Sequence, residues 1–213
     1  MSLKNLPGDC MYQFRHVIVL FFILAAGAGL LLAGDLRFAS ENIDVRILPP
    51  DTVEVTGEYF FASSDSSACA GRVIYPFPAD SGAGDPFGII VRQNDTRKDL
   101  PFGRVVRGIT FAVEVHEKGT TGITVIYRQR FATGTGRYIL TTTAGWGRPL
   151  VNSRYSLHVP VNTVLEYLSY ECDTVFTSGT DLTYYFFKRE FMPDRDLVFS
   201  WHDATGRGAA AKK

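Results

Sequence analysis

Residues 17–34, VIVLFFILAAGAGLLLAG, constrain this chain most, because the run contains no charged or strongly polar side chain. As an α-helix, the run would be about 27 Å long, which is close to the roughly 30 Å hydrocarbon core of a bilayer. A helix at the surface of a soluble core would carry a polar side, and this run has none. We therefore expect a single transmembrane helix at 17–34, preceded by a short cytoplasmic segment at 1–16.

The apolar run could be kept as an anchor or removed as a signal peptide. Arg15 precedes it like the basic region of a signal peptide, and Ala26-Gly27-Ala28 has the small-x-small pattern that a signal peptidase reads. Cleavage after Ala28 would leave the apolar residues GLLLAG at the new N-terminus, where they have no evident partner. This favours an uncleaved signal anchor, and cleavage remains the alternative.

The orientation of the anchor follows mainly from the position of the folded part. Basic residues flank the run almost evenly, with Lys4 and Arg15 before it and Arg37 and Arg46 after it. The large folded segment follows the helix, which is typical of a signal anchor with a cytoplasmic N-terminus. We expect the C-terminal domain to be extracytoplasmic, in the periplasm or outside the cell.

Small residues recur on one face of the predicted helix, at Ala25, Gly29 and Ala33. A spacing of four residues places them on the same side, where they let a second helix approach closely. We expect this face to pack against the helix of another membrane protein subunit, within the lipid bilayer. The alternative is that Ala and Gly are simply common in such segments.

Beyond the helix, the hydrophobic period changes to that of strands. In 52–61, apolar Val53, Val55, Tyr59 and Phe61 alternate with polar residues, as in a half-buried strand. Further strands are expected at 72–75, 88–92, 109–115, 123–129, 138–143, 155–159, 164–170, 182–187 and 197–201.

These strands are separated by turn residues at short spacings. That arrangement predicts an all-β fold, an immunoglobulin-like antiparallel β-sandwich over 51–203. We expect a linker at 35–50 that ends in Pro49-Pro50, and a flexible tail at 204–213.

Two cysteines, Cys69 and Cys172, fall beyond the predicted membrane helix. An oxidising compartment would permit one disulfide between them. Two isolated thiols are the other interpretation.

The charge balance and the missing motifs exclude several functions. The 22 basic and 22 acidic residues leave no excess of positive charge for binding nucleic acid. The sequence lacks the motifs of serine hydrolases, zincins, P-loops and EF-hands. The four histidines show no spacing that requires a metal. We therefore expect no catalytic residue, cofactor or metal site.

Aromatic residues are the remaining functional candidates. Phe60, Tyr185 and Phe187 break the alternation of their strands and place large side chains on both faces. Such a strand either lies within two packed layers or meets a partner on its outer face. Trp146, between two glycines, is either a ligand platform of the kind used by sugar-binding sandwiches or a cap on the core.

Together these features predict a membrane-anchored, non-catalytic interaction or scaffold module, an accessory subunit of a larger membrane complex. The alternative is a module that binds cell-surface or periplasmic carbohydrate. A less favoured hypothesis is an anchored hydrolase whose site is assembled from dispersed residues.

Overall fold

The computed structural model describes residues 36–63, 67–80 and 82–204. The predicted transmembrane helix at 17–34 and its seam of Ala25, Gly29 and Ala33 lie outside these ranges. Within them, we find no helix with the length and apolar character needed to cross a membrane.

The described residues form thirteen strands and one 3₁₀-helix. The strands are β1 (Leu36–Leu48), β2 (Thr52–Ser63), β3 (Cys69–Pro76), β4 (Phe87–Gln93), β5 (Gly103–Val105), β6 (Gly108–Val115), β7 (Thr120–Arg130), β8 (Thr135–Tyr138), β9 (Leu150–Pro160), β10 (Thr163–Leu168), β11 (Thr174–Ser178), β12 (Asp181–Phe191) and β13 (Leu197–Asp203). The 3₁₀-helix η1 (Thr141–Trp146) follows β8.

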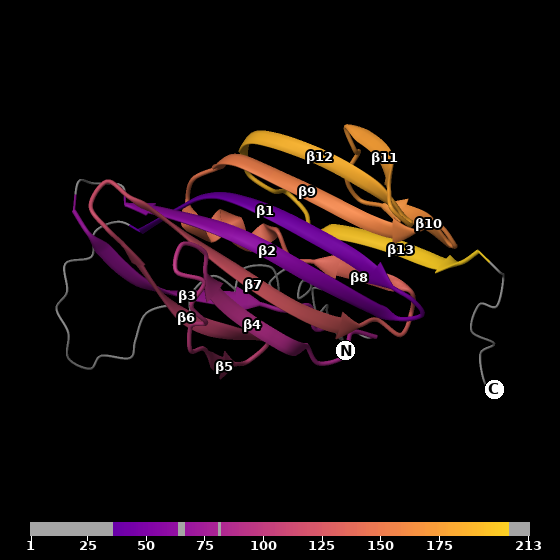
Figure 1. The fold of residues 1–213 in the computed structure, drawn as a ribbon, viewed down its shortest axis with the longest axis horizontal. Coiled ribbons are helices and arrows are strands. Elements are labelled where there is room, and N and C mark those ends of the chain that lie inside the picture. The colour runs from indigo at the N-terminus through magenta and orange to yellow at the C-terminus, as the bar shows by residue number, and fades with distance from the viewer. Residues whose placement is uncertain (1–35, 64–66, 81, 205–213) are drawn as a thin grey trace, which may run out of the picture. The chain divides into compact units, whose positions relative to one another are not determined.

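One large sheet dominates this part of the chain (Figure 1). Its seven strands have the order β11-β12-β9-β1-β2-β7-β4. Two three-stranded sheets, β10-β13-β8 and β3-β6-β5, lie behind it in this view, together with η1. Alternate side chains of β2 are buried in the core between the layers, as the alternation in the sequence predicts.

The prediction of an all-β sandwich is confirmed, but the arrangement of its sheets differs from the immunoglobulin layout. Immunoglobulin sandwiches divide their strands into sheets of three to five, whereas here seven strands share one sheet. The predicted antiparallel order also has an exception, because β1 and β9 are parallel. A parallel pair needs a long connection between its strands, and here β2 to β8 supply it.

The predicted linker at 35–50 was wrong, because most of it forms β1 in the middle of the large sheet. Ile43, Val45 and Ile47 alternate into the core, as strand residues do. A register shift between Phe38 and Ser40 interrupts that alternation, which made the strand hard to recognise.

The predicted strand at 138–143 was also wrong, because β8 ends at Tyr138 and the chain turns into η1. Asp196 stabilises this turn: its Oδ1 accepts hydrogen bonds from the backbone N–H groups of Leu140 and Thr141 and from the Thr141 hydroxyl. The short strands β5 and β11 escaped prediction because all their residues are exposed and show no buried side.

Candidate functional site

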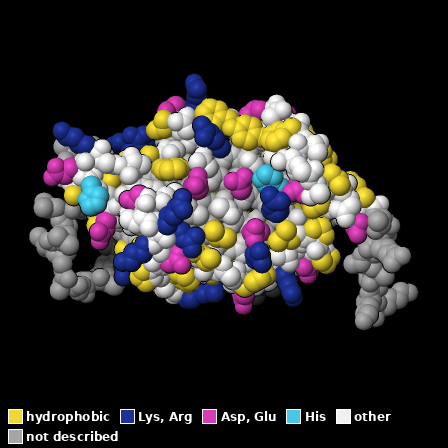
Figure 2. All heavy atoms as spheres, viewed as in Figure 1, with side chains coloured by type: hydrophobic (Ala, Val, Ile, Leu, Met, Phe, Trp, Pro, Cys, Tyr) yellow, Lys and Arg dark blue, Asp and Glu magenta, His cyan; other side chains and the backbone are white. Residues whose placement is uncertain are grey.

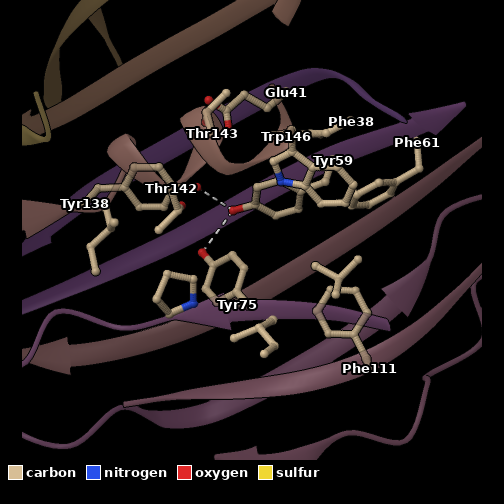
Figure 3. A pocket seen from close by; sticks show the side chains of 14 residues that line it. Phe38, Glu41, Tyr59, Phe61, Tyr75, Phe111, Tyr138, Thr142, Thr143 and Trp146 are labelled. Atoms are coloured by element: carbon tan, nitrogen blue, oxygen red, sulfur yellow. Dashed lines mark hydrogen bonds between the residues drawn. The ribbon is translucent and has the colours of Figure 1, made fainter. Parts of the chain in front are cut away.

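A small pocket lies on the inner side of the large sheet, where β1 and β2 face β3, β8 and η1 (Figure 3). Its volume of about 50 Å³ has room for roughly three or four water-sized groups. Aromatic rings form one wall: the Phe38 centroid lies 5.5 Å from that of Phe61 and 5.8 Å from that of Trp146. Ile74 and Thr142 line the pocket and are exposed, so it opens to solvent beside them.

Glu41 of β1 is the charged residue of the pocket. It follows the register shift in β1 and points to the core, where it is 3% exposed. The Tyr155 hydroxyl donates a hydrogen bond of 2.6 Å to its Oε1. Burial raises the pKa of Glu41 from 4.5 to about 7, and the bond from Tyr155 partly opposes this shift. The carboxyl group can therefore change its charge near neutral pH.

Three tyrosine hydroxyls meet beside this carboxyl group (Figure 3). Tyr59 donates to the Tyr75 oxygen over 2.9 Å, and its own oxygen lies 2.7 Å from that of Tyr138. Burial raises the pKa of each well above its ordinary value, so all three stay neutral at physiological pH. The Tyr59 ring lies over Gly57, where a Cβ would overlap the tyrosine hydroxyl.

The chemistry of the pocket suits recognition of a small group. One carboxyl group supplies a variable charge, neutral hydroxyls supply hydrogen bonds, and aromatic rings supply apolar walls. In the described part of the chain, no group of three or more His, Cys, Asp and Glu residues could hold a metal ion.

Trp146 packs on the core, which is one of the two interpretations of its sequence position. It ends η1, is half-buried and packs its ring 5.8 Å from those of Phe38 and Phe61, so it caps the core. The same ring lines the pocket. A role in ligand binding stays a prediction.

Phe60, Tyr185 and Phe187 lie on the other face of the large sheet, away from the pocket. All three are half-buried, whereas their neighbours Tyr59 and Phe186 point into the core. They are therefore side chains of a solvent face that no other described layer covers.

Charged side chains of both signs lie among hydrophobic ones on that face (Figure 2). The guanidinium groups of Arg154 and Arg189 lie 5.9 and 5.5 Å from the centre of the Phe187 ring. Such cation–π contacts give Phe187 partners within the chain itself. A binding role for this face remains a prediction.

Cys69 and Cys172 are free thiols in the structure, and a disulfide between them stays a prediction. Cys69 is buried in β3, in a three-stranded sheet, whereas Cys172 lies half-buried between β10 and β11. The alternative of two isolated thiols fits these positions.

Sequence reasoning missed Glu41 and the meeting of the three tyrosines. One signal was available, because Glu41 is in phase with the buried Ile43, Val45 and Ile47. A carboxyl group on the apolar side of a strand marks a buried polar site. The assignment of 35–50 to a linker hid that signal.

A second candidate feature is the outer edge of β11, at the end of the large sheet. All five residues of β11 are exposed, and among the described strands it pairs with β12 alone. Val175 and Phe176 are 46% and 47% exposed. Nearby in the sequence, Val161, Val164 and Tyr167 are also exposed, at 61%, 41% and 54%.

Comparison with known proteins finds a solved structure of similar fold. No protein-family model and no curated protein matches the sequence. A candidate nutrient-binding protein from Legionella pneumophila has a similar structure, with a TM-score of 0.65 and 16% identity over 80% of this chain and 68% of that chain. An M1 zinc metallopeptidase from Deinococcus radiodurans aligns at a TM-score of 0.47 and 9% identity, over 78% of this chain and 42% of the peptidase. At 16% identity, the likeness to the Legionella protein concerns the fold alone.

Proposed function

We propose that the β-domain is a non-catalytic interaction module whose partner pairs with the edge strand β11. The observation that carries this proposal is the unprotected state of that edge. Its sequence, TVFTS, contains no charge, proline or glycine. Natural sheets use such residues, bulges or covering loops to prevent strands from adding to their edges. An edge without them suits a partner that supplies the next strand.

The opposite edge of the same sheet provides a direct contrast. There the chain covers β4 with its own following loop: Leu100 N–H donates to the Val91 carbonyl over 2.8 Å, and Gln93 N–H donates to the Lys98 carbonyl over 2.9 Å. The register of β4 is also interrupted, between Phe87 and Ile90. The sheet thus protects one edge and leaves the other open within the described residues.

The partner we propose is an extended segment of another membrane protein subunit, with β-branched or aromatic side chains that pack on Val175 and Phe176. The proposal includes the anchor at 17–34, with the helix seam as a second contact in the membrane. The domain would then act outside the cytoplasm as an accessory subunit. Alkaline carbonate extraction tests the anchor, and release of the full-length chain into the soluble fraction would contradict it.

Site-specific photo-crosslinking in native membranes tests the β11 contact. A photoreactive residue at Val175 should give one adduct of defined mass, and Phe176→Lys should weaken that adduct at least fivefold. The matched control is Val106, which is 93% exposed and lies between β5 and β6. Random collisions would label Val106 more than Val175, so equal labelling at both positions, or none at Val175, overturns the proposal.

The carbohydrate-binding alternative would use Trp146 as its platform. Trp146→Ala should then abolish binding on a glycan array. The packing of its ring against Phe38 and Phe61 leaves less surface for sugar stacking than an exposed ring would offer. This makes the interaction module the better supported of the two.

A further inference from the structure

The pocket contains a buried acid, Glu41, for which the described residues supply no basic partner. Among the described residues that line it, none is Lys, Arg or His. The hydrogen bond that the described structure gives Glu41 comes from Tyr155 and reaches Oε1. A buried carboxylate is stable only when a positive charge or several donors compensate it. The described lining residues therefore supply no positive charge that would balance an ionised Glu41.

The walls of the pocket fit an organic cation. The faces of aromatic rings attract ammonium groups, and Phe38, Phe61 and Trp146 lie together along one side. Tyrosine oxygens, including that of Tyr59, can accept hydrogen bonds from N–H groups. Carboxylate, hydroxyl oxygens and aromatic faces together favour an alkylammonium group over an anion or a neutral molecule.

The size of the pocket limits the ligand. A volume of about 50 Å³ accommodates a primary amine with roughly two to four non-hydrogen atoms, such as methylammonium or ethanolamine. Tetramethylammonium cannot donate a hydrogen bond to the carboxylate and is bulkier at the nitrogen.

We propose that the Glu41 pocket binds the ammonium group of a small primary amine. Glu41 supplies the counter-charge, Tyr59 and Tyr138 supply acceptor oxygens, and the ring of Trp146 closes one side. The opening beside Ile74 and Thr142 admits the head group. This site is on the inner side of the large sheet and is independent of the proposed β11 contact.

The fluorescence of Trp146 reports on occupancy of the pocket in the full-length chain in mild detergent. The sequence has two tryptophans, so the measurement uses a Trp201→Phe background in which Trp146 alone emits. Methylammonium and ethanolamine should change the emission saturably at pH 8, with a dissociation constant on the order of 1 mM for so small a ligand. Glu41→Gln should weaken this response at least tenfold. The matched control, Glu58→Gln, alters a glutamate on the solvent face of β2 and should leave the response unchanged.

The pH dependence provides a second readout that needs no variant. With a pKa of about 7, the Glu41 carboxyl group is about one-tenth ionised at pH 6 and nine-tenths at pH 8. In the described part of the chain, the other titratable groups around it are Tyr59 of β2, Tyr75 of β3, Tyr138 of β8 and Tyr155 of β9. Burial raises the pKa of each, so they stay neutral in this range. Amine affinity should therefore rise about tenfold from pH 6 to pH 8.

Several outcomes overturn the proposal. They are the absence of a saturable response at pH 8, an equal response to potassium chloride, sodium acetate or tetramethylammonium, and a Glu41→Gln response equal to that of the unaltered chain. A folding defect in that variant would appear in its unfolding curve, and the pH comparison on the unaltered chain then decides.

Discussion

Tyr155 of β9 donates a hydrogen bond of 2.6 Å to Glu41 of β1, across the parallel strand pair of the large sheet. The two residues are 114 positions apart in the chain. This contact and the surrounding apolar layer place a carboxyl group in the core, where its ionisation is coupled to folding.

Glu41→Gln should remove a pH dependence of stability. Because the folded-state pKa of Glu41 is raised from 4.5 to about 7, the unfolded chain loses this proton first as the pH rises. The free energy of unfolding should therefore fall between pH 4.5 and 7, by about 3 kcal/mol, and then level off. The variant should lack this contribution and be more stable than the unaltered chain at pH 8. Urea unfolding at pH 5 and pH 8 measures it, and identical pH profiles for both proteins would refute it.

Gly57→Ala should destabilise the fold by about 1–3 kcal/mol, as overpacking of a core does. A Cβ at Gly57 would overlap the Tyr59 hydroxyl and displace the ring from its partners Tyr75 and Tyr138. Gly145→Ala is the control, since a Cβ there meets no atom within 4 Å. Thermal unfolding compares the two variants. Equal melting temperatures would show that Tyr59 moves aside without loss.

Gln129→Glu should cost about 2–4 kcal/mol, because it buries a group that cannot replace two donated hydrogen bonds. Gln129 is fully buried, and its Nε2 donates to the Pro78 and Gly84 carbonyls over 2.7 and 2.8 Å. These two bonds hold the segment between β3 and β4 against β7. Gln93→Glu on β4 changes a half-buried side chain and should have a small effect. Denaturant midpoints measure both, and a similar loss in the two variants would contradict the role of Gln129.

The cysteines should differ in reactivity. Cys69 is 4% exposed and should resist an alkylating reagent in the folded chain, whereas the half-buried Cys172 should react. Peptide mapping by mass spectrometry after native labelling, without reductant, measures both. If neither thiol reacts until a reductant is added, a disulfide joins them after all.

Local alternation in the sequence was sufficient to predict much of this domain. It identified β2, β6 and β7 as strands and assigned Val53, Val55 and Tyr59 to the core, because a strand with one buried face must alternate. Where the alternation was interrupted or missing, the prediction failed. It missed β1, which has a register shift near Phe38, and β11, whose residues are all exposed.

The candidate sites depended on contacts between distant segments. The sequence by itself determined an all-β domain, its main strands and an apolar run at 17–34. Only the tertiary structure decided that Tyr155 is hydrogen-bonded to Glu41 and that the hydroxyls of three tyrosines from separate strands are hydrogen-bonded to one another. It also decided that β11 lies at an edge of the large sheet that no other described strand covers. The physical reason is that burial and pairing depend on which strands become neighbours, and a periodic pattern specifies the face of each strand without specifying its partner.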